Sequence, residues 1–451
     1  MDQIKFDLIN PTAPLRRASE GAQPPSPRVF RFSMLPSLYV AASMPTCVET
    51  RIVDEDVEPI NYDTNADLIG ISFMTYNAPR AYEIAQKFRQ EKGKPVIFGG
   101  YHPTLLPEEA SQYADAVCVG DAEPIVPTII EDFKNGHLKP IFTSQPASLE
   151  NLPIPKRELI EAKDYAPLSV MQATRGCHFR CTFCSVAAFH QYKFRTRPID
   201  EVLAELETLG NFVLFMDDSL TADREYAKEL FSKMAPLGKT WFSQCSASIA
   251  QDPELLDLAS RSGCRGLFVG FESLSSKNLQ TWKKHKNVGQ DYLEIVNNLH
   301  AAGIAIYAGF VFGTDDDTPD VFQKTLEFLL ESNVEVLQAT TMTPFPGTPL
   351  YGEMSANGRI IDRDWSLYDF GHVVYEPKHM SRETLFNGVA WVKSQFYSRK
   401  NIFRRSWRSR RYMGSSLVMK AVLPLNLGYR QKMAGEDVSR CAQAYEQAMS
   451  V

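Results

Sequence analysis

The chain has 451 residues, enough for two or three domains of ordinary size. Apolar residues make up 44% and charged residues 23% of it, a balance that is typical of globular proteins and excludes global disorder. The formal net charge is −6, so the molecule as a whole is not a general binder of polyanions. No apolar run is long enough to span a bilayer and no secretion signal opens the chain, so we expect a soluble, cytoplasmic protein.

Residues 1–137 alternate between strand and helix patterns. Apolar runs predict strands at Lys5–Asn10, Arg51–Asp54, Asp67–Phe73, Pro95–Phe98 and Ala114–Val119. Helical spacing of apolar residues predicts helices at Ala78–Glu91 and Ile125–Lys134. This alternation indicates a Rossmann-like α/β domain, with a parallel sheet covered on both faces. Ligands of such sheets bind at the carboxyl ends of the strands, where the sequence places Asn10, Ser72, Gly99, Gly100 and Gly120.

Residues 138–164 are rich in proline and charge, which predicts a linker. Residues 165–343 then repeat strand and helix six times. Strands are expected at Leu168–Thr174, Phe212–Met216, Thr240–Ser246, Arg265–Glu272, Ile304–Phe312 and Val334–Thr341. Helices are expected at Ile199–Leu209, Ala222–Leu237, Asp252–Arg261, Gln290–Ala302 and Pro319–Ser332. Six such repeats predict a partial or complete (β/α)6 barrel, with an open doubly wound sheet as the alternative.

Residues 344–451 lose this pattern and form a mixed C-terminal segment, which we expect to cap the barrel and to supply substrate contacts. Between Arg399 and Arg411 there are seven basic residues and no acidic one, with Phe403 and Trp407 at helical spacing. Such a helix can meet nucleic acid, an anionic membrane or an acidic partner, or it can simply be solvated. We expect no nucleic-acid partner, and we keep a peripheral membrane contact through Arg399–Arg411 as the alternative to a solvated face.

Three of the eight cysteines, Cys177, Cys181 and Cys184, fall within eight residues directly after the first barrel strand. Parallel barrels carry their chemistry in the loops at this end of the strands. Soft thiolates select zinc or an iron–sulfur cluster, and a structural zinc site needs a fourth ligand that His178 cannot easily supply while its neighbour binds. A four-iron cluster held by three cysteines leaves one iron open. We therefore predict a [4Fe–4S] cluster on these three thiolates.

The CxxxCxxC spacing, with an aromatic residue before the third cysteine, resembles the signature of the radical SAM superfamily. In that family the open iron chelates S-adenosylmethionine (SAM), and reduction of the cluster yields a 5′-deoxyadenosyl radical. Further motifs follow in the expected order at strand ends: Met216–Ser219, Gly270–Ser273, Gly309–Gly313 and Pro346–Thr348. The resemblance implies that SAM is contacted by Phe183, Asp217, Asp218, Ser219, Glu272, Gly309 and Gly313.

Residues 5–135 resemble the cobalamin-binding domain that precedes many radical SAM barrels. The similarity lies in Ser72–Thr75, Gly99–Pro103 and Gly120–Glu123, where small residues let the backbone approach a bulky ligand. The resemblance implies cobalamin contacts from Asn10, Ser72, Thr75, Gly99, Gly100 and Gly120. None of the eight histidines has an aspartate two residues before it, so the DxHxxG motif that ligates cobalt elsewhere is absent. A domain that serves as a scaffold without the cofactor is therefore the alternative.

Together these features lead to a radical SAM enzyme that acts on a small molecule and draws electrons from a flavodoxin- or ferredoxin-like donor. The leading hypothesis is cobalamin-dependent methylation of an unactivated carbon in a natural product or lipid. The alternative is a cobalamin-independent dehydration, epimerisation or rearrangement, for example of a sugar or aminocyclitol diol. A non-catalytic cobalamin- or metal-binding regulator is a third reading, but it would have no use for an open iron or for paired acids on the next strand.

Overall fold

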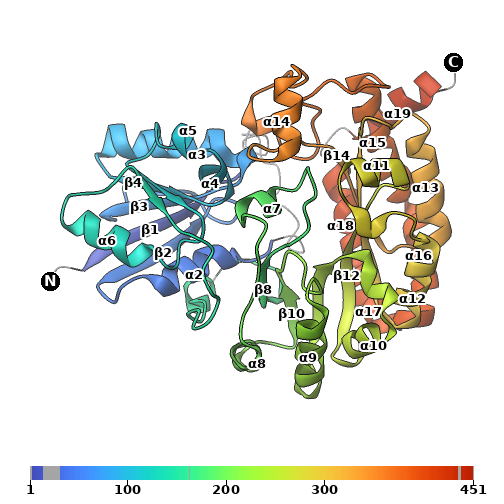
Figure 1. Cartoon of the computed structure of the whole chain (residues 1–451), viewed down its shortest axis with the longest axis horizontal. Helices are drawn as coiled ribbons and strands as arrows, with labels where there is room; N and C mark the ends of the chain where they lie inside the picture. Colours follow the sequence, from blue (N-terminus) through green and yellow to red (C-terminus); the bar gives the residue numbers. More distant parts are fainter. Residues whose placement is uncertain (1–2, 14–30, 162, 435–437, 450–451) are drawn as a thin grey trace.

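The computed structural model describes residues 3–13, 31–161, 163–434 and 438–449, which form two parallel sheets and a helical C-terminal segment (Figure 1). The N-terminal sheet lies on the left of that view, the barrel strands lie in the centre and the C-terminal helices lie along the right. The predicted class, a Rossmann-like domain followed by a partial α/β barrel, is confirmed. Within the described residues, no helix is both long enough and apolar enough to cross a bilayer.

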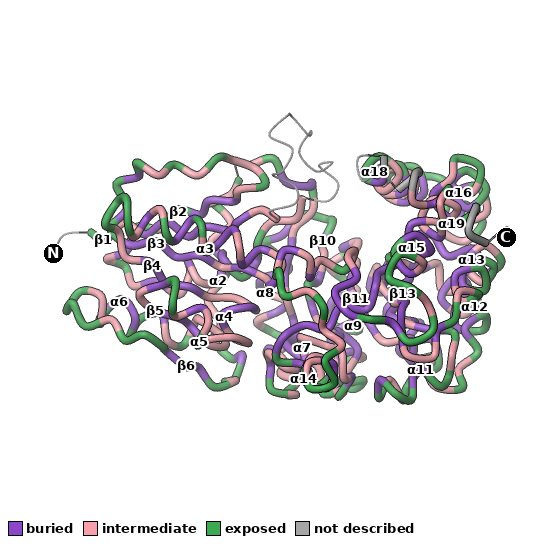
Figure 2. The backbone as a smooth tube through the Cα atoms, turned by 90° about the horizontal axis from the view of Figure 1, so that it is seen from above, coloured by how far each residue is buried: buried purple, intermediate pink, exposed green. Residues whose placement is uncertain are grey.

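The N-terminal sheet has six parallel strands in the order β2-β1-β3-β4-β5-β6. Strands β1, β3, β4 and β5 are short, mainly apolar runs that are buried along most of their length, as expected where helices cover both faces (Figure 2). Helices α3 and α5 pack on one face, and α2 and α6 pack on the other. The strands are β1 (Ile4–Asn10), β2 (Val48–Asp54), β3 (Leu68–Ser72), β4 (Val96–Gly99), β5 (Ala116–Val119) and β6 (Ile141–Thr143). The helices are α2 (Leu35–Ser43), α3 (Ala78–Gln86), α4 (Tyr101–Leu105), α5 (Pro107–Ala110) and α6 (Val126–Lys134).

The sheet extends past the boundary that the sequence predicts at residue 137. Strand β6 lies inside the range 138–164, predicted as a linker, and it pairs with β5 in parallel. A three-residue strand between prolines at 140 and 146 has too short an apolar pattern to be recognised. The remainder of that range follows the expected irregular course, with one short turn of 3₁₀ helix at Arg157–Ile160.

The second sheet also has six parallel strands, in the order β7-β10-β11-β12-β13-β14, with β7 and β14 at its edges. It is a partial barrel, whose strands are β7 (Ser169–Met171), β10 (Phe212–Phe215), β11 (Thr240–Cys245), β12 (Cys264–Glu272), β13 (Ala305–Phe312) and β14 (Val336–Thr341). Its outer helices are α8 (Ile199–Thr208), α9 (Arg224–Met234), α10 (Pro253–Arg261), α12 (Tyr292–Ala301) and α13 (Val321–Ser332). An aspartate caps the start of three of them by accepting a backbone N–H bond, at Asp223, Asp252 and Asp291.

The predicted first barrel strand, Leu168–Thr174, is in fact divided. Its first part is β7, and its last residue begins β8 (Thr174–Gly176), which leaves the barrel and pairs antiparallel with β9 (Phe194–Thr196). The division follows from Asp217 at the end of β10, whose carboxylate accepts backbone N–H bonds from Ala173 and Thr174. This contact bridges more than forty residues of sequence, so no local pattern predicts it.

The C-terminal segment packs along one side of the barrel. It comprises α14 (Pro349–Ala356), α15 (Arg382–Phe396), α16 (Arg399–Met413), α17 (Ser415–Leu417), the π-helical turn η9 (Val418–Val422), α18 (Leu423–Ala434) and α19 (Val438–Met449). Glu335, just before β14, joins this segment to the barrel: its carboxylate accepts hydrogen bonds from Ser409 and Tyr412 of α16 and from the Ile306 N–H of β13.

Candidate active site

The three cysteines lie on the loop between β8 and α7 (Ser185–Phe189). Gly176, the last residue of β8, has a φ of 82°, and a Cβ atom at this position would lie 2.1 Å from the carbonyl oxygen of Lys193. Only glycine therefore fits directly before Cys177. The far end of the loop is fixed by Cys184, which immediately precedes the first residue of α7.

The middle of this loop is anchored to the barrel through Trp282. The Thr182 N–H donates to the Trp282 carbonyl at 3.2 Å, and the Phe183 ring lies edge-on to the Trp282 indole with their centroids 5.1 Å apart. Phe183, which the sequence assigns to SAM, is packed against the core of the barrel. Its position supports a role in shaping the cysteine loop.

The donor set fits an iron–sulfur cluster. Burial raises the pKa of Cys177 and of Cys184 to about 11. At neutral pH these thiols are therefore protonated unless they bind a metal, which displaces the proton. Among the residues that the structure describes, no three His, Cys, Asp or Glu side chains meet closely enough to hold a single metal ion. A cubane cluster does not require this, because each thiolate binds a different iron.

Lys284 is a charged group of the site that the sequence analysis missed. Its Nζ lies 2.9 Å from Glu272 Oε1, and both side chains are mostly buried. Burial raises the pKa of all three cysteines, and the Lys284 ammonium partly offsets that effect. Lys284 lies in a short basic run without a motif, so only the fold reveals its nearness to the thiols.

The two acids after β10 have different environments. Asp217 is fully buried, and its carboxylate accepts from the N–H groups of Ala173 and Thr174 and from the Thr174 hydroxyl, although burial raises its pKa to about 7. Asp218 accepts from the Gly176 N–H at 2.7 Å, directly before the first cysteine. Ser219 is buried, and among the described residues its hydroxyl has no hydrogen-bond partner. Asp217 thus holds the strand connection, and Asp218 lies closer to the cysteine loop.

The remaining SAM candidates divide between the barrel interior and its outer wall. Gly309 lies beside the Phe268 ring, which is 2.7 Å from where its Cβ would stand. Gly313 has a φ of 93°, and a Cβ there would lie 2.3 Å from the Tyr375 hydroxyl. Gly313 therefore faces the C-terminal segment. The positive φ and the close contact with Tyr375 require a glycine at this position. Glu272 also has a positive φ, 67°, which turns its carboxylate toward Lys284.

A cavity of about 2070 Å³ lies between the two sheets. Ligand pockets usually measure roughly 300–1,000 Å³, so this space can take more than one small molecule. The carboxyl ends of β1, β3, β4 and β5 form one wall, and the barrel strands and the segment from Met413 to Tyr429 form much of the rest. Strands β12, β13 and β14 contribute their first residues to this lining. Asp217 and Asp218 line it, as do Arg175 and His190 on either side of the cysteine loop.

Five of the six cobalamin candidates line this cavity, and Thr75 does not, although its neighbours Met74 and Tyr76 do. The five are Asn10, Ser72, Gly99, Gly100 and Gly120. Asn10 is buried and accepts a hydrogen bond from Ser37, while its Nδ2 has no partner among the described residues. A buried donor beside a cavity fits a ligand with amide or carbonyl acceptors, such as the rim of a corrin ring.

The two glycines at the end of β4 differ. Gly100 has a φ of 98°, and a Cβ there would lie 2.8 Å from the Phe73 backbone, so a side chain is excluded. At Gly99 the nearest atom to a Cβ would be 3.8 Å away, which is an ordinary contact. Strain from an added side chain is thus expected at Gly100 alone.

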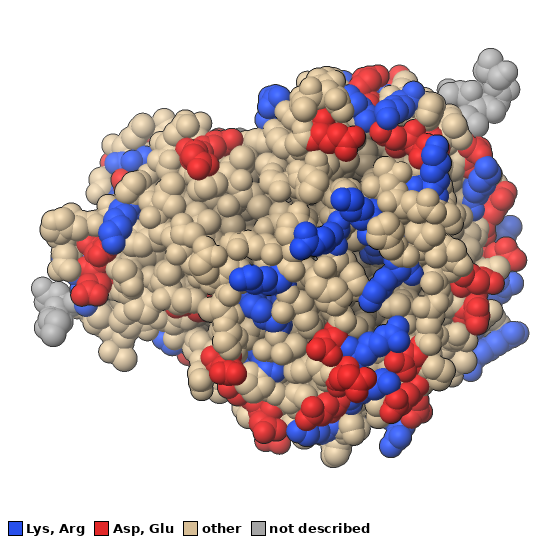
Figure 3. Space-filling model, viewed as in Figure 1, with Lys and Arg blue, Asp and Glu red and all other residues tan. Residues whose placement is uncertain are grey.

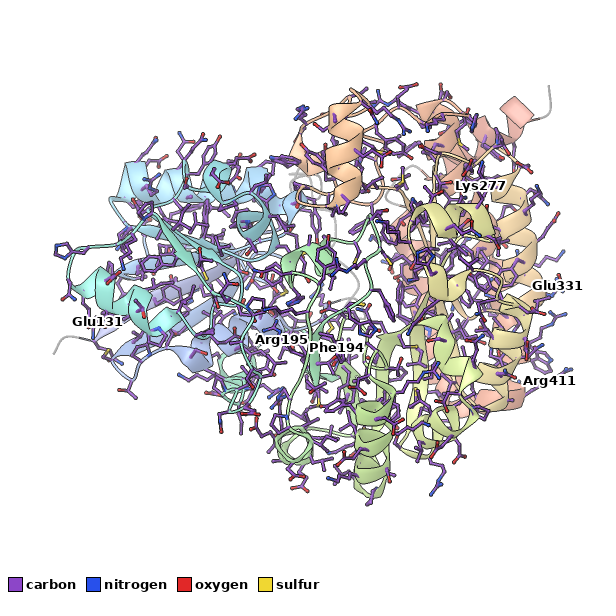
Figure 4. The ribbon with its side chains drawn as sticks, viewed as in Figure 1. Glu131, Phe194, Arg195, Lys277, Glu331 and Arg411 are labelled. Atoms are coloured by element: carbon purple, nitrogen blue, oxygen red, sulfur yellow. The ribbon has the colours of Figure 1, made fainter. Side chains whose placement is uncertain are left out.

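Charged pairs join the two halves beside the cavity. Arg175 of β8 donates to Glu123 at 2.6 Å, and Arg195 of β9 pairs with Asp121. Arg195 also lies 2.9 Å from the His190 ring, and it stands between the halves in Figure 4. These pairs link the Gly120–Glu123 turn to the cysteine loop. Their partners lie 52 and 74 residues apart in the sequence, so no local pattern predicts them.

The C-terminal aromatics, which the sequence leaves without a role, hold the segment in place. Trp365 Nε1 donates to Glu109 of the N-terminal half at 2.8 Å, and Tyr375 donates to the Gly313 carbonyl. The Pro346–Thr348 motif forms a turn: Gly347 abuts Leu105, and Thr348 caps α14. These contacts hold the C-terminal segment against the rest of the protein and give its aromatic residues a role in stability rather than in the reaction.

Comparison with known proteins matches both halves. Residues 171–329 match the model of the Radical SAM superfamily, and residues 39–130 match that of the B12 binding domain. The chain is 36% identical over 358 residues to bacteriochlorophyllide d C-12(1)-methyltransferase of Chlorobaculum tepidum, covering 75% of this chain and 76% of that protein. It is 25% identical to the hopanoid C-2 methylase of Rhodopseudomonas palustris, covering 72% of this chain and 65% of that protein.

Two solved structures share the fold. The cobalamin-dependent SAM radical enzyme OxsB, with aqua-cobalamin and SAM bound, superposes with a TM-score of 0.68 at 13% identity, covering 99% of this chain and 81% of that one. The radical SAM methyltransferase TsrM of Kitasatospora setae, with cobalamin and a [4Fe–4S] cluster, gives a TM-score of 0.60 at 17% identity, covering 79% of this chain and 78% of that one.

The chain belongs to the radical SAM superfamily, and it carries the B12-binding domain before the barrel. It is a radical SAM enzyme whose cofactors are a [4Fe–4S] cluster, SAM and cobalamin. The family assignment and these cofactor predictions are confirmed, while the individual residues assigned to each cofactor stay predictions.

Proposed function

We propose that this enzyme methylates an unactivated carbon of a polycyclic, largely apolar small molecule. The observation that carries the proposal is a cavity of about 2070 Å³ that is lined by the carboxyl ends of the N-terminal strands and by Met216, Asp217 and Asp218 at the end of β10. SAM at the reduced cluster supplies the abstraction of a hydrogen atom, and the corrinoid supplies the methyl group. Because both halves of the protein line this cavity, one substrate in it can approach both cofactors.

Aromatic residues in the cavity indicate the class of substrate. The barrel part of the cavity is lined by Phe242, Phe268 and Tyr307, whose rings exclude water and suit a flat or fused-ring substrate. Relatives that act on bacteriochlorophyllides and on hopanoids support this class, because both are polycyclic molecules. We place tetrapyrroles first because the relative with 36% identity is named for one.

The proposed contacts of the cofactors follow the geometry of the described residues. Cys177, Cys181 and Cys184 hold the cluster, while Asp218 and the Lys284–Glu272 pair give charged contacts beside it. Asn10 donates to the corrinoid, and Gly100 and Gly120 keep the backbone close to it. An external flavodoxin- or ferredoxin-like protein supplies the electrons, and we propose the cytoplasm as the location, in line with cysteines that form no disulfide in the described part of the chain.

The experiment is an anaerobic assay of the protein reconstituted with iron, sulfide and hydroxocobalamin, with a bacteriochlorophyllide-type tetrapyrrole and a hopanoid offered separately. We expect bound corrinoid and a product heavier by one CH2 unit from one of these substrates. A protein that forms product without any corrinoid would refute methyl transfer, and it would favour dehydration, epimerisation or rearrangement.

A further inference from the structure

The outer face of α16 combines aromatic and basic side chains. Phe403 and Trp407 are 60% and 67% exposed, four residues apart and therefore on one side of the helix. The same side carries Lys400, Arg404 and Arg411, which are exposed. Figure 4 shows Arg411 at the outer edge of the molecule, pointing away from the barrel, and Figure 3 shows basic side chains along that edge.

The opposite side of α16 is fixed to the protein. Arg405, one of the seven basic residues of the sequence pattern, is buried and donates to the Phe396 carbonyl and to Asn426, so it is not part of the surface. Ser409 donates to Glu335 at 2.7 Å, and the Tyr412 ring stacks on His300 at 4.1 Å. These contacts hold the helix in one rotation, with its aromatic and basic side outward.

The surface basic residues lack acidic neighbours. Within the described part of the chain, no Asp or Glu lies in ion-pair range of Arg399, Lys400, Arg404, Arg408, Arg410 or Arg411. In contrast, exposed Lys139, Arg261 and Lys277 each have an acidic partner. An acidic chain of net charge −6 thus concentrates unpaired positive charge on one helix.

We propose that this face of α16 binds an anionic lipid bilayer. Arginines complement anionic headgroups, while Trp407 and Phe403 are suited to the interface between headgroups and acyl chains. Met419 of η9, which packs against α16, adds a 60% exposed apolar side chain that is suited to the acyl-chain region. These features favour a bilayer over a nucleic acid.

The position of the face links it to the cavity. Gly414, Ser415 and Ser416 follow α16 directly, and they are exposed and line the cavity, so the cavity opens there. A bilayer held against α16 would lie beside this opening and could pass an apolar substrate into it. The membrane contact itself does not depend on the reaction, because it is measured without substrate or turnover.

The experiment is co-sedimentation of the full-length protein, with its cluster reconstituted, with vesicles of phosphatidylcholine alone or mixed in equal parts with phosphatidylglycerol. We expect binding to the mixed vesicles only. About 1 kcal/mol per basic residue corresponds to ~5-fold, so the triple variant Arg404→Gln/Arg408→Gln/Arg411→Gln should bind about 100-fold more weakly. The matched variant Lys139→Gln/Arg261→Gln/Lys277→Gln removes three exposed charges elsewhere, and it should bind like the wild type.

Tryptophan emission provides a second measurement that does not require the charge variant to fold. The wild type should show a blue shift with mixed vesicles, and Trp407→Phe should lose the shift while retaining binding. Wild-type protein that ignores mixed vesicles, or a folded triple variant that binds as tightly as the wild type, would overturn the proposal. Binding to single-stranded nucleic acid without binding to vesicles would overturn it as well.

Discussion

The two sheets line one cavity, but the halves of the molecule to which they belong differ in their chemistry. On the N-terminal side the lining is Asn10, Ser72 and three glycines, and the acids of the following turn are paired with arginines of the other half. On the barrel side Asp217 and Asp218 line the cavity, while the cysteine thiols and the Lys284–Glu272 pair belong to the same half but are not part of the lining. Figure 3 shows the same contrast on the surface in view, where charged side chains are sparser over the N-terminal half.

The difference reflects what each half holds. A corrinoid is large, so a domain can bind it by shape, with backbone brought close by glycine and few charges. A cluster and the amino and carboxylate groups of SAM are charged, and charge-assisted bonds hold them more strongly than neutral ones. Substitutions that change charge should therefore act mainly in the barrel, and those that change backbone space should act mainly in the N-terminal sheet.

The largest effect is expected from Cys181→Ala. The loop holds no fourth thiol that could replace Cys181, so the cluster should be lost together with all formation of 5′-deoxyadenosine, as measured by iron content and product analysis. Cys245→Ala is the control, because this buried cysteine belongs to strand β11 and should leave the iron in place. A Cys181→Ala protein that retained about four irons per chain would exclude this loop as the cluster site.

Lys284→Met should lower SAM affinity and SAM cleavage by about 10- to 100-fold, since a charged contact beside the cluster is lost. It should also destabilise the fold by about 2 kcal/mol, because Glu272 is left mostly buried and unpaired. The double variant Lys284→Met/Glu272→Gln should recover much of the thermal stability, but not the cleavage. Lys283→Met, at the exposed neighbouring residue, is the control. If Lys284→Met and Lys283→Met cleaved SAM equally well, Lys284 would contribute to stability but not to the reaction.

Gly100→Ala and Gly99→Ala form a matched pair on the N-terminal side. Gly100→Ala should cost about 1–3 kcal/mol of stability and weaken corrinoid binding, because its φ is 98° and the Phe73 backbone occupies the space. Gly99→Ala should bind the corrinoid nearly as well as the wild type, since its Cβ has room. Retained corrinoid is read from the visible spectrum after gel filtration, and SAM cleavage should survive in both. Similar corrinoid loss in both variants would contradict the local argument.

The smallest effect is expected from Trp365→Phe, which removes one hydrogen bond between the C-terminal segment and the N-terminal half. About 1 kcal/mol should be lost, because the Glu109 acceptor is partly buried and also serves Tyr82. Trp391→Phe removes an indole bond to Glu446 inside the C-terminal segment, so it should leave the link between the halves unchanged. Thermal unfolding and limited proteolysis would compare them, and greater sensitivity of the Trp391 variant would argue against an inter-half role for Trp365.

Much of the fold could be predicted from the chain because parallel strands covered on both faces are simple apolar runs. The strands Phe212–Met216, Thr240–Ser246 and Ile304–Phe312 lie within one residue of β10, β11 and β13. The failures have a common cause: β6 is too short to carry a pattern, and the break between β7 and β8 depends on Asp217, which lies far along the sequence. Contacts between residues this far apart in the sequence form only in the folded protein, so local patterns do not predict them.

The candidate site could be predicted only where its residues are local. Cys177 to Cys184 form one loop, and the acids after β10 stand at a strand end, so spacing alone identifies them. Lys284 could not be found, since it reaches the thiols from another loop. The sequence also does not show which residue of the basic run in α16 is buried. Arg405 belongs to this run, but it lies inside the protein.

Strand β6 has a practical consequence for dividing this protein. It follows α6, pairs with β5, and places the Ser144 carbonyl 2.7 Å from where a Cβ of Gly120 would stand. A fragment ending at residue 137 would leave the backbone of β5 as an open edge, which invites aggregation. Anyone expressing the N-terminal half separately should retain the chain through Ser144, and a fragment ended there should stay monomeric where the shorter one does not.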